Sequence, residues 1–241
     1  MFYFDPLYLL VTLVALAFSG WATFRVKSAF ARYSQVPAGT GYTGAQVARK
    51  ILDQHGLQDV PVEPVRGFSF LGGDGMLSDH YDPRTRVIRL SPGVYDSRSV
   101  AAQAIAAHEV GHAIQHATGY AALALRNAMA PVAMFGSNFS YILIFLGIFL
   151  HAFAMVKFGI LLFTVAVIFQ FITLPVEIDA SARAKRLLPQ LGLISPADSG
   201  GVSAVLNAAA WTYVAAAAAA VLNLLYLLLR TGLLGGGRSE D

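Results

Sequence analysis

Five consecutive residues near the middle of the chain, His108-Glu109-Val110-Gly111-His112, place two imidazoles four positions apart. On a helix, positions i and i+4 share one face, so both rings can reach one metal ion. Glu109 is turned away from that face and can contact a metal-bound water without being a ligand. Zinc with three protein ligands keeps a fourth position for water, and a carboxylate can accept that water's proton. The pattern predicts a Zn²⁺ site with His108 and His112 as ligands and Glu109 as general base.

The third ligand must come from elsewhere in the chain, and the absence of cysteine restricts it to His, Asp or Glu. His116 lies about 12 Å along a straight helix from His108, so it cannot share the ion and is expected to be a supporting or surface residue. Glu177 follows Pro175 at the end of an apolar stretch, where a carboxylate is costly unless hydrated, paired or metal-bound. A solvated carboxylate at Glu177 and a ligand at Asp179 remain the alternatives.

The composition indicates a membrane protein rather than a soluble domain. Hydrophobic residues make up 56% of the 241 residues and charged residues 13%, against about 25% charged in a soluble domain. A net charge of +3 with no arginine-rich stripe argues against a nucleic-acid partner. A helix needs about 20 apolar residues to span a bilayer. Four stretches approach or exceed that length: 7–24, 133–153, 158–174 and 202–229. The second and third are expected to form a hairpin joined near His151 and Lys157.

The distribution of basic residues predicts the orientation of these stretches. Of the 17 Lys and Arg residues, 14 lie in the two segments 25–130 and 176–201. The positive-inside rule places both segments in the cytosol, with the cluster directly after the first stretch carrying most weight. That stretch has no basic residue before it and no evident cleavage site, so it is expected to be an uncleaved anchor.

The segment between the first two apolar stretches contains signals for a small folded region. Thr43 is expected to begin a helix over about 44–55, and Gly56 to end it. Residues 76–81 and 86–90 flank Asp82-Pro83-Arg84-Thr85, which predicts a β hairpin. Asp96 or Ser97 is expected to open the helix that carries the histidines, over about 98–118, with Gly119 at its end.

Four segments together resemble the YugP-like family of neutral zinc metallopeptidases from bacterial membranes. The resemblance covers about residues 40–190 and is more specific than the two-histidine motif alone. Its residues are LSDHYDP (Leu77–Pro83), RLS (Arg89–Ser91), AAHEVGHAIQH (Ala106–His116) and LPVEIDASARA (Leu174–Ala184).

The resemblance implies a gluzincin-type site in the bacterial cytoplasmic membrane, with Glu177 as the third zinc ligand and a peptide or membrane protein as substrate. Many related membrane peptidases, including the prenyl-protein proteases, have an aspartate where this chain has Ser181; the serine agrees with the YugP-like pattern and argues against a prenylated substrate. The DHYDP element suggests that His80 or Tyr81 donates to the oxyanion. The alternative is that this element only shapes the turn through Asp82. The strand near 87–90 is expected to pair with an extended substrate, as edge strands do.

The sequence therefore predicts a mainly α, four-span integral membrane peptidase with a cytosol-facing, zincin-like minidomain that contains a small β hairpin. The rival interpretation is a membrane scaffold or adaptor with a structural or vestigial zinc site. Glu109 argues against that rival, because a structural site needs no base. An intramembrane protease is disfavoured because the helix with the motif is too polar to face lipid. The expected segments are an anchor (1–24), a cytosolic zincin-like region (25–130), a transmembrane hairpin (131–175), a cytosolic segment with the third ligand (176–201), a fourth transmembrane helix (202–231) and a disordered tail (232–241).

Overall fold

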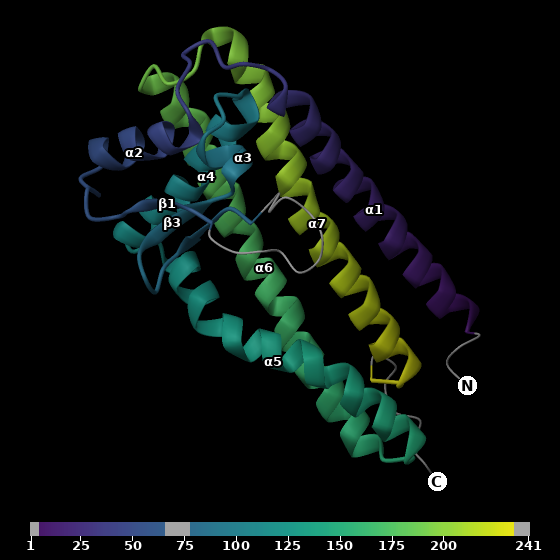
Figure 1. The fold of residues 1–241 in the computed structure, drawn as a ribbon. Coiled ribbons are helices and arrows are strands. Elements are labelled where there is room, and N and C mark those ends of the chain that lie inside the picture. The colour runs from purple at the N-terminus through teal and green to yellow at the C-terminus, as the bar shows by residue number, and fades with distance from the viewer. Residues whose placement is uncertain (1–4, 66–77, 234–241) are drawn as a thin grey trace. The chain divides into compact units, whose positions relative to one another are not determined.

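The computed structural model describes residues 5–65 and 78–233, and most of them are helical. The chain divides into two compact units. The first consists of Met1–Ala22, Ala124–Pro175 and Thr212–Asp241, and the second of Thr23–Leu123 and Val176–Trp211. The helices and strands, coloured along the chain in Figure 1, are α1 (Pro6–Ser34), α2 (Gly44–Gln54), β1 (Val62–Pro64), β2 (His80–Asp82), β3 (Val87–Leu90), α3 (Pro92–Tyr95), α4 (Val100–Ala117), α5 (Ala121–Phe149), α6 (Phe153–Gln190), η1 (Pro196–Asp198) and α7 (Ser199–Arg230).

The first unit is built from long apolar helices. Among the described residues, α1, α5, α6 and η1–α7 are long and apolar enough to cross a membrane, and α4 is not in this set. The predicted hairpin is formed by α5 and α6, although its turn lies at residues 150–152, and Phe153 already begins the second helix. A Cβ at Gly159 would lie 2.7 Å from the Ile144 side chain. Glycine therefore permits the close approach of the two helices.

The helices extend beyond the apolar stretches on which the sequence prediction was based. Helix α1 continues through the basic residues to Ser34, α5 begins at Ala121, and α6 continues past Pro175 to Gln190. Hydropathy locates only the part of a helix suited to lipid. Backbone hydrogen bonding continues through Ala, Arg and Lys, which are good helix formers in water. Of the predicted tail, residues 234–241 lie outside the described part of the chain.

The second unit contains a sheet with strand order β1-β3-β2. The predicted hairpin is confirmed for its described residues, because β2 and β3 pair antiparallel; residues 76 and 77 lie outside the described part. Asp82 closes the turn by accepting hydrogen bonds from the Arg84 amide (2.9 Å) and the Thr85 hydroxyl (2.7 Å). The Thr85 hydroxyl and the Arg84 amide lower the pKa of Asp82 to about 2.

The position of β3 in the sheet corrects one expectation. β1, which the sequence analysis did not predict, pairs with β3 in parallel, opposite the side taken by β2. The strand Val87–Leu90 is therefore central, and its backbone groups are used on both sides. It is not free to pair with a substrate, so the prediction of a substrate-binding edge there was wrong. β1 was missed because it has only three residues and includes Pro64.

Helices α2 and α4 pack against each other in the core of the second unit. The predicted start of α2 is confirmed by a capping box in which Thr43 accepts from the Gln46 amide and the Gln46 side chain accepts from Thr43. Helix α4 begins at Val100 with Ser99 as its cap, a few residues later than predicted. Ser99 itself is extended (φ −82°, ψ 159°) and pairs with Pro37 in an isolated bridge, so the helix begins only after it. Gly119, with φ +66°, follows the end of α4 as predicted.

Candidate metal centre

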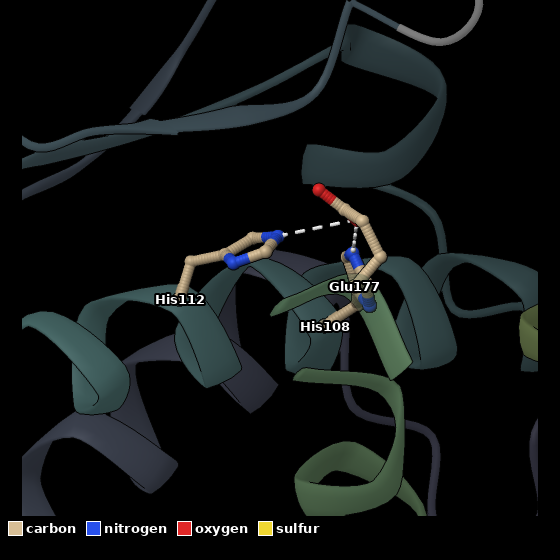
Figure 2. A group of neighbouring side chains, drawn as sticks. All are labelled: His108, His112 and Glu177. Carbon is tan, nitrogen blue, oxygen red and sulfur yellow. Dashed lines mark hydrogen bonds and ion pairs between the residues drawn. The ribbon is translucent and has the colours of Figure 1, made fainter. Parts of the chain in front are cut away.

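Helix α4 presents His108 and His112 on one face, one turn apart, with their ring centres 4.8 Å from each other. Glu177 reaches the same place from α6, as Figure 2 shows. Its Oε2 lies 3.3 Å from Nε2 of His108 and 3.6 Å from Nε2 of His112. One possible ligand atom from each of the three residues lies within 4.8 Å of those of the other two. The three predicted ligands are thus brought together, within the second unit.

Gly111 explains how α6 can approach α4 closely enough to deliver Glu177. A Cβ at Gly111 would lie 2.7 Å from the carbonyl oxygen of Ala180 and 3.0 Å from its Cα. These are backbone atoms of a helix, so they cannot move aside as a flexible side chain would. Ala180 lies less than one turn after Glu177. The glycine within the two-histidine motif therefore sets the spacing between the helices that hold the site.

Burial and donor chemistry fit a zinc ion. Glu177 is 2% exposed and His112 8% exposed. A buried carboxylate needs a cation or hydrogen-bond donors to remain charged. Two imidazole nitrogens and one carboxylate oxygen form a ligand set that catalytic zinc sites use, with one position left for water. The residues present therefore suit a catalytic zinc ion.

The Nδ1 atom of each histidine ring is hydrogen-bonded, which leaves the two Nε2 atoms to face Glu177. Nδ1 of His108 lies 3.1 Å from the Ser181 hydroxyl, and Nδ1 of His112 lies 2.9 Å from Oε1 of Gln115. Such contacts fix the direction of a metal-binding ring and raise its basicity. Ser181, which stands where many related peptidases have an aspartate, was not predicted from the sequence to make this contact.

Glu109 lies on the side of α4 that faces the hairpin. Its Oε2 accepts a hydrogen bond from the backbone N–H of Tyr81 (3.0 Å), and the residue is buried. Asp79 adds a second carboxylate to this region. Burial and the negative charge of Glu109 raise the pKa of Asp79 to about 6, against the opposing hydrogen bonds from Ser91. Glu109 and the first strand of the hairpin are therefore directly connected.

The remaining candidates from the sequence lie outside the three-residue cluster. His80 is exposed, and its Nδ1 bonds to the Ser78 carbonyl (2.7 Å). The Tyr81 hydroxyl bonds to Nδ1 of His116 (2.8 Å), so His116 contacts the hairpin and not the cluster of His108, His112 and Glu177. Asp179, the competing third ligand, accepts from Arg183 (2.6 Å) and is not in the cluster.

Gln115 and Asp79 were not recognised from the sequence as parts of the site. Gln115 follows His112 by three residues, which places both on one face of α4. A fully buried glutamine beside a possible ligand was the available signal, but burial could not be read without the position of α6. Asp79 is the first residue of the DHYDP element, and nothing in the sequence pattern separates it from the turn-forming Asp82.

Comparison with known proteins places the chain in a family. Residues 8–232 match the family described as "Putative neutral zinc metallopeptidase". The chain belongs to this family of zinc metallopeptidases, as the resemblance in the sequence predicted.

The chain is also similar to a bacterial membrane protein over nearly its full length. It is 48% identical over 235 residues to the "Putative membrane protease YugP" of Bacillus subtilis (strain 168). The aligned region covers 98% of this chain and 100% of that relative. No solved structure matches the chain.

Proposed function

We propose that this protein is a membrane-bound zinc endopeptidase whose site is formed by His108, His112 and Glu177. The observation that carries the proposal is the convergence of these three side chains, from two helices, beside the buried carboxylate of Glu109. Family membership supports zinc as the metal and a peptide bond as the target.

The roles of the residues follow from their contacts. A zinc ion bound here would lower the pKa of a water molecule and polarise the substrate carbonyl. His108, His112 and Glu177 hold the ion. Glu109 removes the proton of the attacking water and passes it to the leaving nitrogen, and the Tyr81 amide orients its carboxylate.

Purified protein in lipid nanodiscs should cleave members of a mixed peptide library. A chelator should abolish the cleavage, and one equivalent of Zn²⁺ should restore it. The same protein stripped and reloaded with Mg²⁺ is the control, because Mg²⁺ prefers oxygen ligands in octahedral geometry. Zinc binding without cleavage of any peptide or membrane substrate would favour the scaffold interpretation instead.

We propose that the second unit faces the cytosol and that both termini lie on the external side of the cytoplasmic membrane. The basis is the concentration of Lys and Arg in segments 25–130 and 176–201. Reporter fusions after Asp59 and Ala197 should therefore read cytosolic, and one at Ser239 external. A cytosolic reading at Ser239 would contradict the proposed number or direction of the spans.

Of the two candidates for stabilising the oxyanion, the contacts favour Tyr81. The Tyr81 amide contacts Glu109, so this residue begins beside the proposed base, while the exposed His80 ring bonds to Ser78. The Tyr81 hydroxyl, which bonds to His116, would have to turn away from it to reach the oxyanion. Tyr81→Phe removes the hydroxyl but keeps the amide. It should lower kcat by roughly 10²- to 10³-fold, the usual scale for one donor, with zinc content unchanged.

His80→Ala is the matched variant for the neighbouring residue. A loss of turnover in His80→Ala with normal turnover in Tyr81→Phe would transfer the role to His80. Near-normal turnover in both variants would leave the DHYDP element with a structural role only.

A further inference from the structure

Gln115 is fully buried on α4 and uses its side-chain amide to connect His112 with helix α6. Its Oε1 lies 2.9 Å from Nδ1 of His112. Its Nε2 lies 2.8 Å from the carbonyl oxygen of Val176 and 2.8 Å from Oδ2 of Asp179. All of these residues belong to the second unit.

The partners of Gln115 determine which way its amide is turned. A peptide carbonyl and an ionised carboxylate can only accept hydrogen bonds, so the NH₂ group must face Val176 and Asp179. The amide oxygen then faces His112, and an oxygen can only accept. Nδ1 of His112 must therefore carry the proton, and the lone pair of its Nε2 faces Glu177 and the site.

Asp179 is itself held in place by a charged partner. Its Oδ2 accepts a hydrogen bond of 2.6 Å from Nε of Arg183, one turn further along α6. Charge-assisted hydrogen bonds are roughly twice as strong as neutral ones. The chain of contacts thus runs from Arg183 through Asp179 and Gln115 to His112.

The other histidine of the site, His108, has no equivalent constraint. Its Nδ1 contacts the Ser181 hydroxyl, which can either donate or accept. The hydroxyl is therefore compatible with both neutral forms of His108. Of the two histidines, only His112 has its protonation site dictated by the side chain that its Nδ1 contacts.

We propose that Gln115 is a positioning residue that keeps the proton of His112 on Nδ1 and leaves Nε2 free to bind the metal. Asp179 and Arg183 fix the orientation of the Gln115 amide. This proposal rests on the proposed zinc site. Its consequence is that zinc affinity depends on three residues that do not touch the ion. Removal of such supporting contacts typically weakens metal affinity by about 10- to 100-fold.

Gln115→Met tests the proposal, because it keeps the length and burial of the side chain but removes the amide. The zinc dissociation constant, measured by competition with a chelator in detergent, should rise by about 10- to 100-fold. The visible spectrum of the Co²⁺-loaded protein should also change, because the His112 ring is no longer held.

Gln103→Met is the matched control. Gln103 is equally buried on the same helix and also donates to a backbone carbonyl, that of Tyr42 (2.8 Å). Both variants should lose thermal stability, but Gln103→Met should keep the wild-type zinc affinity and cobalt spectrum. Equal losses of zinc affinity in the two variants, or no loss in Gln115→Met, would overturn the proposal.

Asp179→Ala provides a test that does not alter the core, because the Asp179 side chain is 31% exposed. It should weaken zinc binding by less than Gln115→Met, since the Val176 carbonyl still orients the amide. Unchanged affinity in Asp179→Ala would remove Asp179 and Arg183 from the proposal.

The outcome is separable from that of the proposed function. Wild-type protein that binds zinc and cleaves peptides, together with an unaffected Gln115→Met, would refute only the role of Gln115. Loss of zinc in Gln115→Met from a protein that cleaves nothing would refute only the peptidase.

Discussion

Glu109→Gln is expected to abolish peptide cleavage while the protein keeps about one zinc ion per chain. The change preserves the size of the side chain and its acceptor for the Tyr81 amide, but it removes the basic carboxylate. General acid–base catalysis contributes about 10²- to 10⁴-fold to a rate. The loss should lie at the upper end, because the same group is proposed to activate the water and to protonate the leaving nitrogen. Turnover and zinc content of the same preparation provide the measurement.

Zinc content separates this expectation from its alternatives. If Glu109→Gln empties the site, the residue is a ligand or a structural element and the proposed division of roles fails. If turnover is unchanged, another group is the base, and Asp79 is the nearby carboxylate to replace next. The inactive variant is also suited to retain substrates in membrane fractions, where proteomics can identify them.

The pairing of His108 and His112 on α4 could be predicted from the sequence because their relation is local. Residues four apart on a helix share a face whatever the rest of the fold does. The start of α2 at Thr43 and the turn at Asp82 were predictable for the same reason, since each depends on side chains within three residues of the backbone that they bind.

The features that local spacing could not supply depend on contacts between segments far apart in the chain. Glu177 is 69 residues from His108, and its place beside the histidines follows from the close packing of α4 and α6 at Gly111. Its position at the end of an apolar stretch already favoured Glu177 over Asp179, and the family resemblance strengthened that preference. The role of Gln115 depends on Val176 and Asp179, which lie 61 and 64 residues away. The central position of β3 depends on β1, whose three residues carry almost no periodic signal.

Glu177→Ala is expected to remove the metal itself. Two imidazoles on one helix leave a zinc ion under-coordinated, because such sites use three protein ligands and water. The truncation also leaves a space in a buried position that is 2% exposed in the native protein. Metal analysis after dialysis against a mild chelator should find about one zinc ion per chain in the wild type and almost none in Glu177→Ala.

Glu177→Gln makes this test independent of packing, because it keeps the volume of the side chain but offers only a neutral oxygen. It should bind zinc far more weakly than the wild type. His116→Ala is the control on the same helix as the histidine ligands, since His116 contacts Tyr81 and should leave the zinc content unchanged. Full zinc in both Glu177 variants, with a loss in His116→Ala, would show that the third ligand comes from α4 and that Glu177 only neutralises the histidines. Retention of zinc in Glu177→Gln alone would mean that the amide oxygen suffices and that the charge of Glu177 is not what binds the ion.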